Sequence, residues 1–184
     1  MSVNISLLRG INMTGHNKIK MTDLAALFRK LGFKDAETYI QSGNVIFTIQ
    51  GDLTTKEIAS IVEGAIARKF GYSVSAIIRT EKELREAVAL NPFLSEKDFD
   101  PAKMAVLFLA ERPSPDQIAK VAKVDYPPDK FKIIGKEIFI YCPNGFGKTK
   151  LYTNFFENKM KVTGTARNWK TINTILEIAE KQQQ

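Results

Sequence analysis

The 184-residue chain has 44% apolar and 26% charged residues, which is typical of a globular protein with a buried core and argues against extended disorder. Its apolar runs fall far short of the roughly 20 residues that span a bilayer, and its start lacks the pattern of a secretory signal. The single cysteine, Cys142, has no partner for an internal disulfide. We therefore expect a cytoplasmic protein that is neither exported nor inserted in a membrane.

The net charge of +7 comes from the two ends of the chain. Residues 21–143 hold 17 basic and 17 acidic side chains, residues 1–20 hold three basic and no acidic ones, and residues 144–184 hold seven basic and three acidic ones. If the ends met in space, they would form a basic face that attracts phosphate groups. The alternative is that the charge only favours solubility.

The first part of the chain has the element order β-α-β-β-α-β, which is that of the ferredoxin-like plait. Apolar residues recur at helical spacing in its helices, and glycine in the hairpin turn permits a positive φ. The predicted elements are a strand over 3–9, a helix with Thr22 as a possible N-cap and Gly32 as its end, strands over 37–41 and 45–50 around a turn at 42–44, a helix opened by the capping box Thr54–Glu57 and ending at Gly71, and a strand over 73–79.

The second part repeats this order after a bridging helix with its own capping box, Thr80–Glu83. We predict an α+β fold of tandem ferredoxin-like plaits with antiparallel sheets in the strand order 4-1-3-2, plus a C-terminal helix. The predicted domains are 1–80, a bridging helix and linker at 81–101, and 102–184. The second plait is predicted from a strand over 104–110, a helix over 115–124, a hairpin of 131–134 and 137–142, a helix over 150–158, a strand over 160–162 and a last helix from about Trp169.

Four motifs in this order resemble those of the domain-of-unknown-function 1697 family. They are residues 7–12 (Leu-Leu-Arg-Gly-Ile-Asn), 39–45 (Tyr-Ile-Gln-Ser-Gly-Asn-Val), 91–93 (Asn-Pro-Phe) and 165–169 (Thr-Ala-Arg-Asn-Trp). The resemblance implies a bacterial cytoplasmic protein of two plaits, and it implies no activity. The chain departs from the family at positions 14–16, where Thr-Gly-His replaces two glycines and a lysine, so His16 is a poor candidate for a shared catalytic role.

Two loops of the first plait hold candidate ligand contacts. Arg9 and Asn12 follow the first strand, and the Arg9 guanidinium could clamp a phosphate or carboxylate. Gln41 and Asn44 in the first hairpin would present donors and acceptors at the same edge. The alternatives are that Arg9 pairs with an acidic side chain, that Asn12 builds its turn, and that the hairpin residues serve the turn alone.

Residues 145–150, Gly-Phe-Gly-Lys-Thr-Lys, resemble a phosphate-binding loop between a strand and a helix. The full P-loop pattern needs a glycine at the position of Cys142, so a nucleotide triphosphatase is not expected. Two glycines would let backbone amides converge on an anion, and Lys148 and Lys150 would add charge. The pattern therefore predicts a looser anion site at these two lysines.

Residues 165–169 are predicted to open the last helix, with Thr165 or Asn168 as its N-cap. Free amides at a helix start favour an anion, so Arg167 and Asn168 are candidate ligand contacts. The alternative is that Trp169 anchors the core and Arg167 has a structural partner.

The sequence offers little for catalysis or metal binding. Cys142 and His16 could in principle form a thiolate–imidazolium pair, but Cys142 ends an apolar strand, where a thiol is usually buried and inert. No two Cys or His residues have ligand spacing, so no metal or cofactor is predicted.

Two classes of function remain. One is a binding module whose basic face engages a phosphorylated small molecule or the backbone of a nucleic acid, although no RNP motif for sequence-specific RNA recognition is evident. The other is an enzyme that acts on a small anionic substrate at the same face, and it lacks a recognisable general base. Arg9, Lys148 and Arg167 are predicted to cluster in either case.

Overall fold

The computed structural model describes residues 1–13 and 15–183; Thr14, one of the positions that depart from the family pattern, lies outside them. The chain forms two compact units, Met1–Glu86 with Thr174–Gln184, and Ala87–Asn173. Each unit contains a four-stranded antiparallel sheet, ordered β2-β3-β1-β4 in the first and β6-β7-β5-β8 in the second. This is the 4-1-3-2 order of the plait, so the predicted fold is confirmed. The domain limits 1–80, 81–101 and 102–184 stay a prediction.

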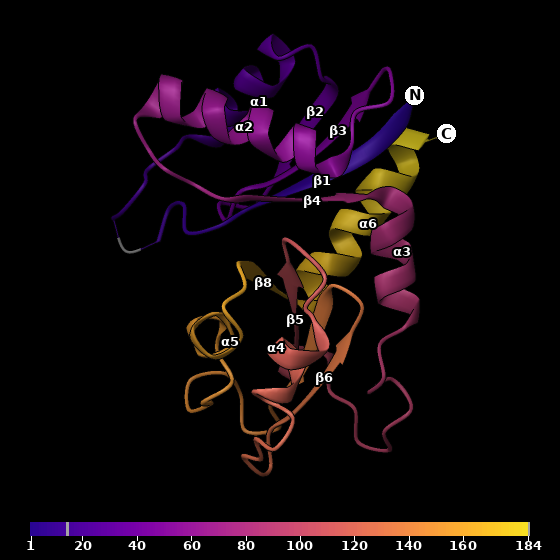
Figure 1. Cartoon of the computed structure of the whole chain (residues 1–184). Coiled ribbons are helices and arrows are strands. Elements are labelled where there is room, and N and C mark those ends of the chain that lie inside the picture. The colour runs from indigo at the N-terminus through magenta and orange to yellow at the C-terminus, as the bar shows by residue number, and fades with distance from the viewer. Residues whose placement is uncertain (14, 184) are drawn as a thin grey trace. The chain divides into compact units, whose positions relative to one another are not determined.

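In the first unit, helices α1 and α2 cover one face of the sheet (Figure 1). Apolar side chains at helical spacing on both helices meet alternate residues of the strands, and Phe33 stacks on Phe47 with ring centroids 4.8 Å apart. The elements of this part are β1 (Ser2–Leu8), α1 (Met21–Lys30), β2 (Lys34–Tyr39), β3 (Asn44–Ile49), α2 (Thr55–Phe70), β4 (Ala76–Thr80) and α3 (Glu81–Ala89).

The capping boxes predicted from the sequence open α2 and α3. Thr54 and Glu57 exchange hydrogen bonds at the start of α2, and Thr80 and Glu83 do so at the start of α3. The prediction for α1 was wrong, because its N-cap is Lys20 and Thr22 lies inside the helix.

The outer strand of the first sheet, β2, is irregular. Its register against β3 shifts between Lys34 and Glu37, and Asp35 has a positive φ of 52°. The carbonyl oxygen of Asp35 accepts a hydrogen bond from Gln182 Nε2 at 3.0 Å. The C-terminal helix α6 (Trp169–Gln183) therefore reaches the edge of this sheet.

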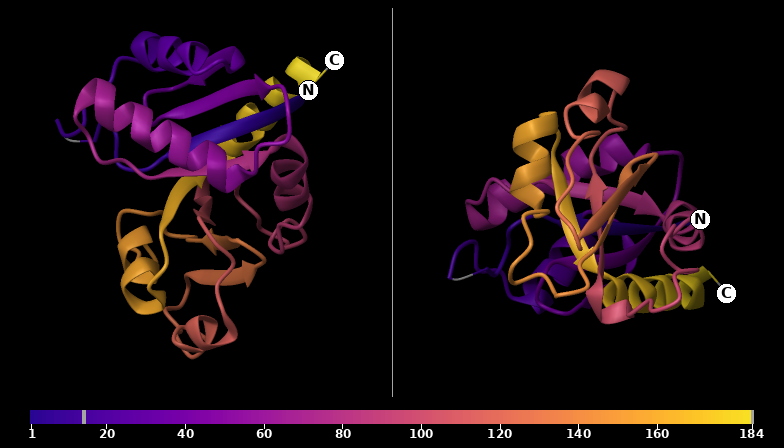
Figure 2. Two further views of the ribbon diagram at one scale, coloured as in Figure 1. Left: turned by 45° about the horizontal axis from the view of Figure 1, so that its top comes forward. Right: turned by 90° about the horizontal axis from the view of Figure 1, so that it is seen from below.

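In the second unit, α4 and α5 cover one face of the sheet, and Figure 2 shows α5 running beside β8. The central strand β5 is buried along its whole length. The elements are a short 3-10 helix (Pro101–Lys103), β5 (Met104–Leu109), α4 (Pro115–Ala119), β6 (Lys130–Ile134), β7 (Glu137–Tyr141), α5 (Thr153–Met160), β8 (Gly164–Asn168) and the start of α6.

Three predictions for this unit were wrong in their bounds. The helix expected over 115–124 ends at Ala119, and the one expected over 150–158 runs from Thr153 to Met160. The strand expected over 160–162 is β8 instead, because Lys161 takes a left-handed φ of 57° that ends α5. No helix in the described part of the chain is long and apolar enough to cross a membrane.

Gly43 offers a test of the first hairpin. Its φ is +78°, and a Cβ atom there would lie 2.6 Å from Ile11 Cδ1 and 2.9 Å from Leu8 Cβ. We expect Gly43→Ala to lower the free energy of unfolding in urea by about 2–5 kcal/mol, because backbone strain and overpacking add.

Gly32→Ala is the matched control. Gly32 also has a positive φ, +84°, but its Cβ position is open, so only the strain of about 1–2 kcal/mol should appear. Equal losses in the two variants would show that the close approach of Gly43 to Ile11 does not constrain the fold.

Candidate functional site

Asn12 joins the first candidate loop to the first hairpin. Its Nδ2 donates to the carbonyl oxygens of Ile19 and Gln41, both at 2.9 Å, and its Oδ1 accepts from the backbone N–H of Ile19 at 2.8 Å. Asn12 has a φ of 54°, a conformation that asparagine tolerates better than most residues. Both amide hydrogens and the amide oxygen are therefore committed to the loop.

The other candidates of the first unit differ in how they are held. Asn44 is fully buried, and its Nδ2 donates to Tyr39 O and to Ser42 Oγ, both at 3.0 Å. Gln41 has an exposed side chain, and Arg9 is half-buried directly after β1. Asn44 is thus closed to solvent, Arg9 and Asn12 are half-buried, and Gln41 is the exposed candidate of this loop cluster.

The second unit contains a pocket of about 310 Å³ that combines two loops. One loop holds Asp125, Tyr126 and Asp129 and includes a cis Pro127–Pro128 peptide bond. The other loop follows β7, turns at Gly145 with a φ of 82°, and carries Lys148, Thr149 and Lys150. The pocket is at the small end of the range for ligand-binding sites.

Lys148 and Lys150, both predicted from the sequence, line this pocket together and are exposed. Lys150 Nζ lies 5.1 Å from the centroid of the Tyr126 ring, a cation–π contact. Among the residues that the structure describes, neither lysine forms an ion pair with an acidic side chain. Two positive charges are therefore available in the lining of the pocket, which also includes the carboxylates of Asp125 and Asp129.

The thiol of Cys142 is buried at the end of β7, next to the residues of this pocket. Burial raises the pKa of Cys142 above its ordinary value of 9.0, the side chain of Asp129 raises this pKa further, and a hydrogen bond with Thr149 opposes the shift. The thiol is thus protonated and poorly nucleophilic at neutral pH, as expected for a cysteine at the end of an apolar strand.

Arg167 and Asn168 were both predicted at the start of the last helix, but both lie in β8, before the first residue of α6. Arg167 is in β8 with 8% of its surface exposed, and its Nη1 donates to Thr165 Oγ1 and to the Ala166 carbonyl, both at 2.8 Å. Burial lowers the pKa of Arg167 to about 10, which still leaves the guanidinium charged at neutral pH. Asn168 is the N-cap of α6, because its Oδ1 accepts from Thr171 N at 2.8 Å, and Thr165 is not the cap.

A second buried arginine, which the sequence analysis did not single out, lies at the equivalent place of the first plait. Arg79 is 1% exposed, sits in β4, and donates from Nη1 to the carbonyl of the residue before it, Ile78, at 2.9 Å. Arg167 does the same with Ala166. Each arginine is followed by one capping residue and then directly by a helix, so the two plaits share a repeat at the residue level.

The structure brings some candidates together and leaves others apart. Lys148 and Lys150 share a pocket, and the loops of Asn12 and Gln41 are bonded to each other. Arg9 belongs to the first unit, whereas Lys148 and Arg167 belong to the second, so their predicted cluster stays a prediction. In the described chain, no group of three or more His, Cys, Asp or Glu could hold a metal ion.

The fold and its loop pocket define an α+β protein made of two plaits. The profile of a family described as "Protein of unknown function (DUF1697)" matches residues 1–139, and the chain belongs to this family. A conserved bacterial protein from Streptococcus pneumoniae has a similar structure, with a TM-score of 0.74 and 24% identity over 98% of this chain and 99% of that one. This likeness shows the fold alone. A comparison with curated proteins found no match.

The role of Asn12 can be tested by stability. Asn12→Ala removes three hydrogen bonds and leaves alanine in a left-handed conformation, so we expect the free energy of unfolding to fall by about 2–4 kcal/mol. Gln41→Ala should change the free energy of unfolding by less than about 0.5 kcal/mol, because Asn12 bonds to the backbone carbonyl of Gln41, which alanine retains. An Asn12→Ala protein as stable as the wild type would contradict this structural role.

The reactivity of Cys142 provides a second test. We expect iodoacetamide to label the native protein at least about a hundredfold more slowly than the urea-unfolded chain, because the thiolate is the reactive form and burial disfavours it. Since the pKa is raised, the native rate should still be rising with pH at the ordinary thiol value of 9.0. A rate that levels off below that pH would contradict the raised pKa.

Proposed function

We propose that this protein binds a small phosphate-bearing ligand in the loop pocket of its second unit. The observation that carries the proposal is the placement of Lys148 and Lys150 at one pocket, exposed and without acidic partners in the described chain. Lysine side chains recognise phosphate as point charges. The Thr149 hydroxyl, another lining group, would add a hydrogen bond to a phosphate oxygen.

The two carboxylates in the pocket lining narrow the chemistry of the ligand. Carboxylates such as Asp125 and Asp129 accept hydrogen bonds from hydroxyl or ammonium groups and repel phosphate. A ligand that carries a phosphate and also hydroxyl or amino donors would satisfy both the lysines and the carboxylates. A phosphorylated polyhydroxyl compound fits this description better than a long nucleic-acid backbone, which would place several phosphates near the carboxylates.

An enzyme that acts on a small anionic substrate is the alternative, and the pocket supplies a candidate base in Asp125. We place the binding function first because Asp129, the other carboxylate, already interacts with the Cys142 thiol. The low cysteine content and the bacterial source of the structural neighbour support a bacterial, cytoplasmic protein.

The test is calorimetric titration with glucose 6-phosphate, with glucose as the probe that lacks phosphate. We expect saturable binding of glucose 6-phosphate and no binding of glucose. Lys148→Ala and Lys150→Ala should each lower the affinity for the ester about tenfold, because each variant removes a charge-assisted contact. Lys123→Ala removes an exposed lysine outside the pocket and is the matched control.

Four outcomes would count against this function. Loss of affinity in Lys123→Ala equal to that in Lys148→Ala would mean a general effect of charge. No binding of the ester at low salt would remove the proposed ligand class. Conversion of the ester during the titration would favour the enzyme. If affinity for an oligonucleotide instead fell with salt by about 0.7 to 0.9 per phosphate and depended on Lys148, the pocket would belong to a nucleic-acid surface.

A further inference from the structure

The face of the second sheet turned away from α4 and α5 carries aromatic and basic side chains. Pairing of β6 with β7 sets Lys130 opposite Tyr141 and Lys132 opposite Phe139, so these four residues point to one face. Phe131 and Ile133, which alternate with the lysines, pack against the helix-covered core instead. Phe139 is 1% exposed, so Tyr141 is the ring of this face that is relevant to stacking. An aromatic ring on a plait sheet with lysines beside it is the kind of group on which single-stranded nucleic acid stacks in other proteins.

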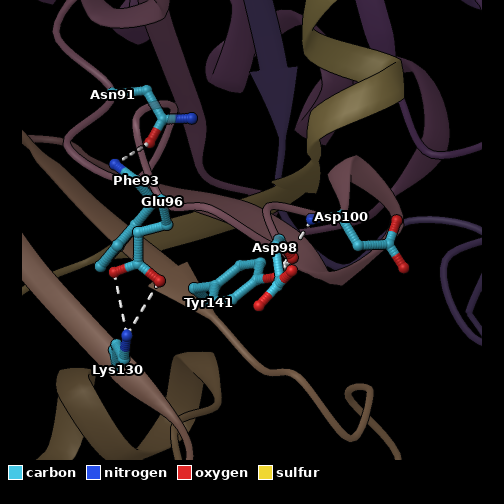
Figure 3. Close-up of polar contacts among 7 residues, drawn as sticks. All are labelled: Asn91, Phe93, Glu96, Asp98, Asp100, Lys130 and Tyr141. Atoms are coloured by element: carbon cyan, nitrogen blue, oxygen red, sulfur yellow. Dashed lines mark hydrogen bonds and ion pairs between the residues drawn. The ribbon is translucent and has the colours of Figure 1, made fainter.

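A segment without helix or strand, residues 91–100, lies over this face at Tyr141 (Figure 3), and we call it the strap. The rings of Phe93 and Phe99 stack on Tyr141 with centroids 5.8 and 5.7 Å apart and interplanar angles of 27° and 23°. The Tyr141 hydroxyl donates to the carbonyl of Asp98 and accepts from the N–H of Asp100, both at 3.1 Å.

The strap also neutralises a lysine of the sheet. Both carboxylate oxygens of Glu96 lie 2.9 Å from Lys130 Nζ, as the dashed lines of Figure 3 mark. Asp98 and Asp100 add two further negative charges to the same seven-residue stretch, 94–100, which also contains one positive charge at Lys97. The strap thus presents to the sheet the same kinds of group as a short single-stranded nucleic acid, namely flat rings that stack on Tyr141 and an anionic group that pairs with a lysine.

The two ends of the strap are fixed, whereas its middle is held to the sheet by the Phe99 stacking, the Asp98 carbonyl bond and the Glu96–Lys130 pair, which are separate contacts of modest strength. Phe93 is 2% exposed and its N–H donates to Asn91 Oδ1, and Asp100 caps the following short helix through the N–H of Ala102. The Glu96–Lys130 pair is partly exposed, with 33% and 51% of the side chains accessible, and such pairs contribute at most about 1 kcal/mol. Within the strap, the backbone bonds of Glu96 and Phe99 are local turns. Residues 94–99 are therefore the part that can open.

We propose that single-stranded nucleic acid binds this face and that the strap competes with it. A base takes the place of Phe99 on Tyr141, and a phosphate takes the place of the Glu96 carboxylate on Lys130. Lys132, which is exposed and has no ion-pair partner among the described residues, contacts the next phosphate. Because binding requires the strap to open, the wild-type affinity is reduced by the fraction of molecules that are open. This surface is distinct from the loop pocket.

The test measures the fluorescence anisotropy of a labelled oligothymidylate of about ten nucleotides, a length that fits one small domain. Glu96→Gln should raise its affinity about two- to fivefold, because it removes one partly exposed ion pair. Tyr141→Phe keeps the ring but loses both hydrogen bonds to the strap, so it should raise the affinity about fivefold. Thermal unfolding of each variant checks that it is folded.

Two further variants complete the design. Asp52→Asn removes an exposed negative charge from the other unit, and its affinity should match the wild type. Lys132→Ala, made in the Tyr141→Phe background, should lower the affinity and reduce the salt slope by about one. If Glu96→Gln and Tyr141→Phe bind the oligonucleotide no more tightly than the wild type, or if Asp52→Asn gains as much as Glu96→Gln, the strap does not compete with nucleic acid and the proposal is wrong.

Discussion

Burial of the central strand on both of its faces is the constraint on which each unit depends. Every residue of β5 is buried, and so is every residue of β1 except Ser2. A plait supplies helices for one face of its sheet, and an antiparallel sheet can leave the other face to water only if that face is polar. Here the central strands place buried apolar side chains, such as Ile5 and Val106, on the second face too, and this part of the face therefore needs a cover of its own. In the second unit the stacking of Phe93 and Phe99 on Tyr141 provides part of it.

The same constraint explains how two arginines can be buried. Arg79 and Arg167 lie on the last strand of each sheet, paired with Ile5 and Val106 of the central strands, on the face opposite the plait helices. A buried guanidinium is costly unless its donors are satisfied, and in both cases one acceptor is the carbonyl of the preceding residue. Both plaits thus bury an arginine at the same position of the last strand, and both satisfy it partly through the backbone carbonyl of the residue before it.

Much of the fold could be predicted because its signals are local. Periodicity and capping boxes located α2 and α3, glycine-containing turns located both hairpins, and the element order defined the plait. The signals failed where polar residues serve a buried strand: Thr165 and Arg167 alternate with Ala166 in β8, and with Asn168 they resemble the start of a helix. The helix at Pro115 ends early, although Val121 and Val124 continue its apolar face through a turn.

The candidate site was only partly predictable, because its geometry depends on pairing between distant segments. Lys148 and Lys150 were evident from the glycine-rich loop. Tyr126 and Asp129 joined them only because the hairpin of β6 and β7 returns the chain to the same end of the sheet. For Asn12, the sequence suggested either a ligand contact or a turn, and a bond to Gln41, 29 positions further along, could not be inferred from local spacing.

The irregular edge strand β2 bears on how the protein behaves at high concentration. An unpaired strand edge is a template on which a neighbouring molecule can add a strand, and repeated addition leads to aggregates. At Asp35 the register shift breaks the regular row of donors and acceptors, and Gln182 already occupies the exposed carbonyl. The last turn of α6 therefore protects this edge from the addition of another strand. Removing Gln182 would expose the edge, and aggregation would increase before the fold itself was lost.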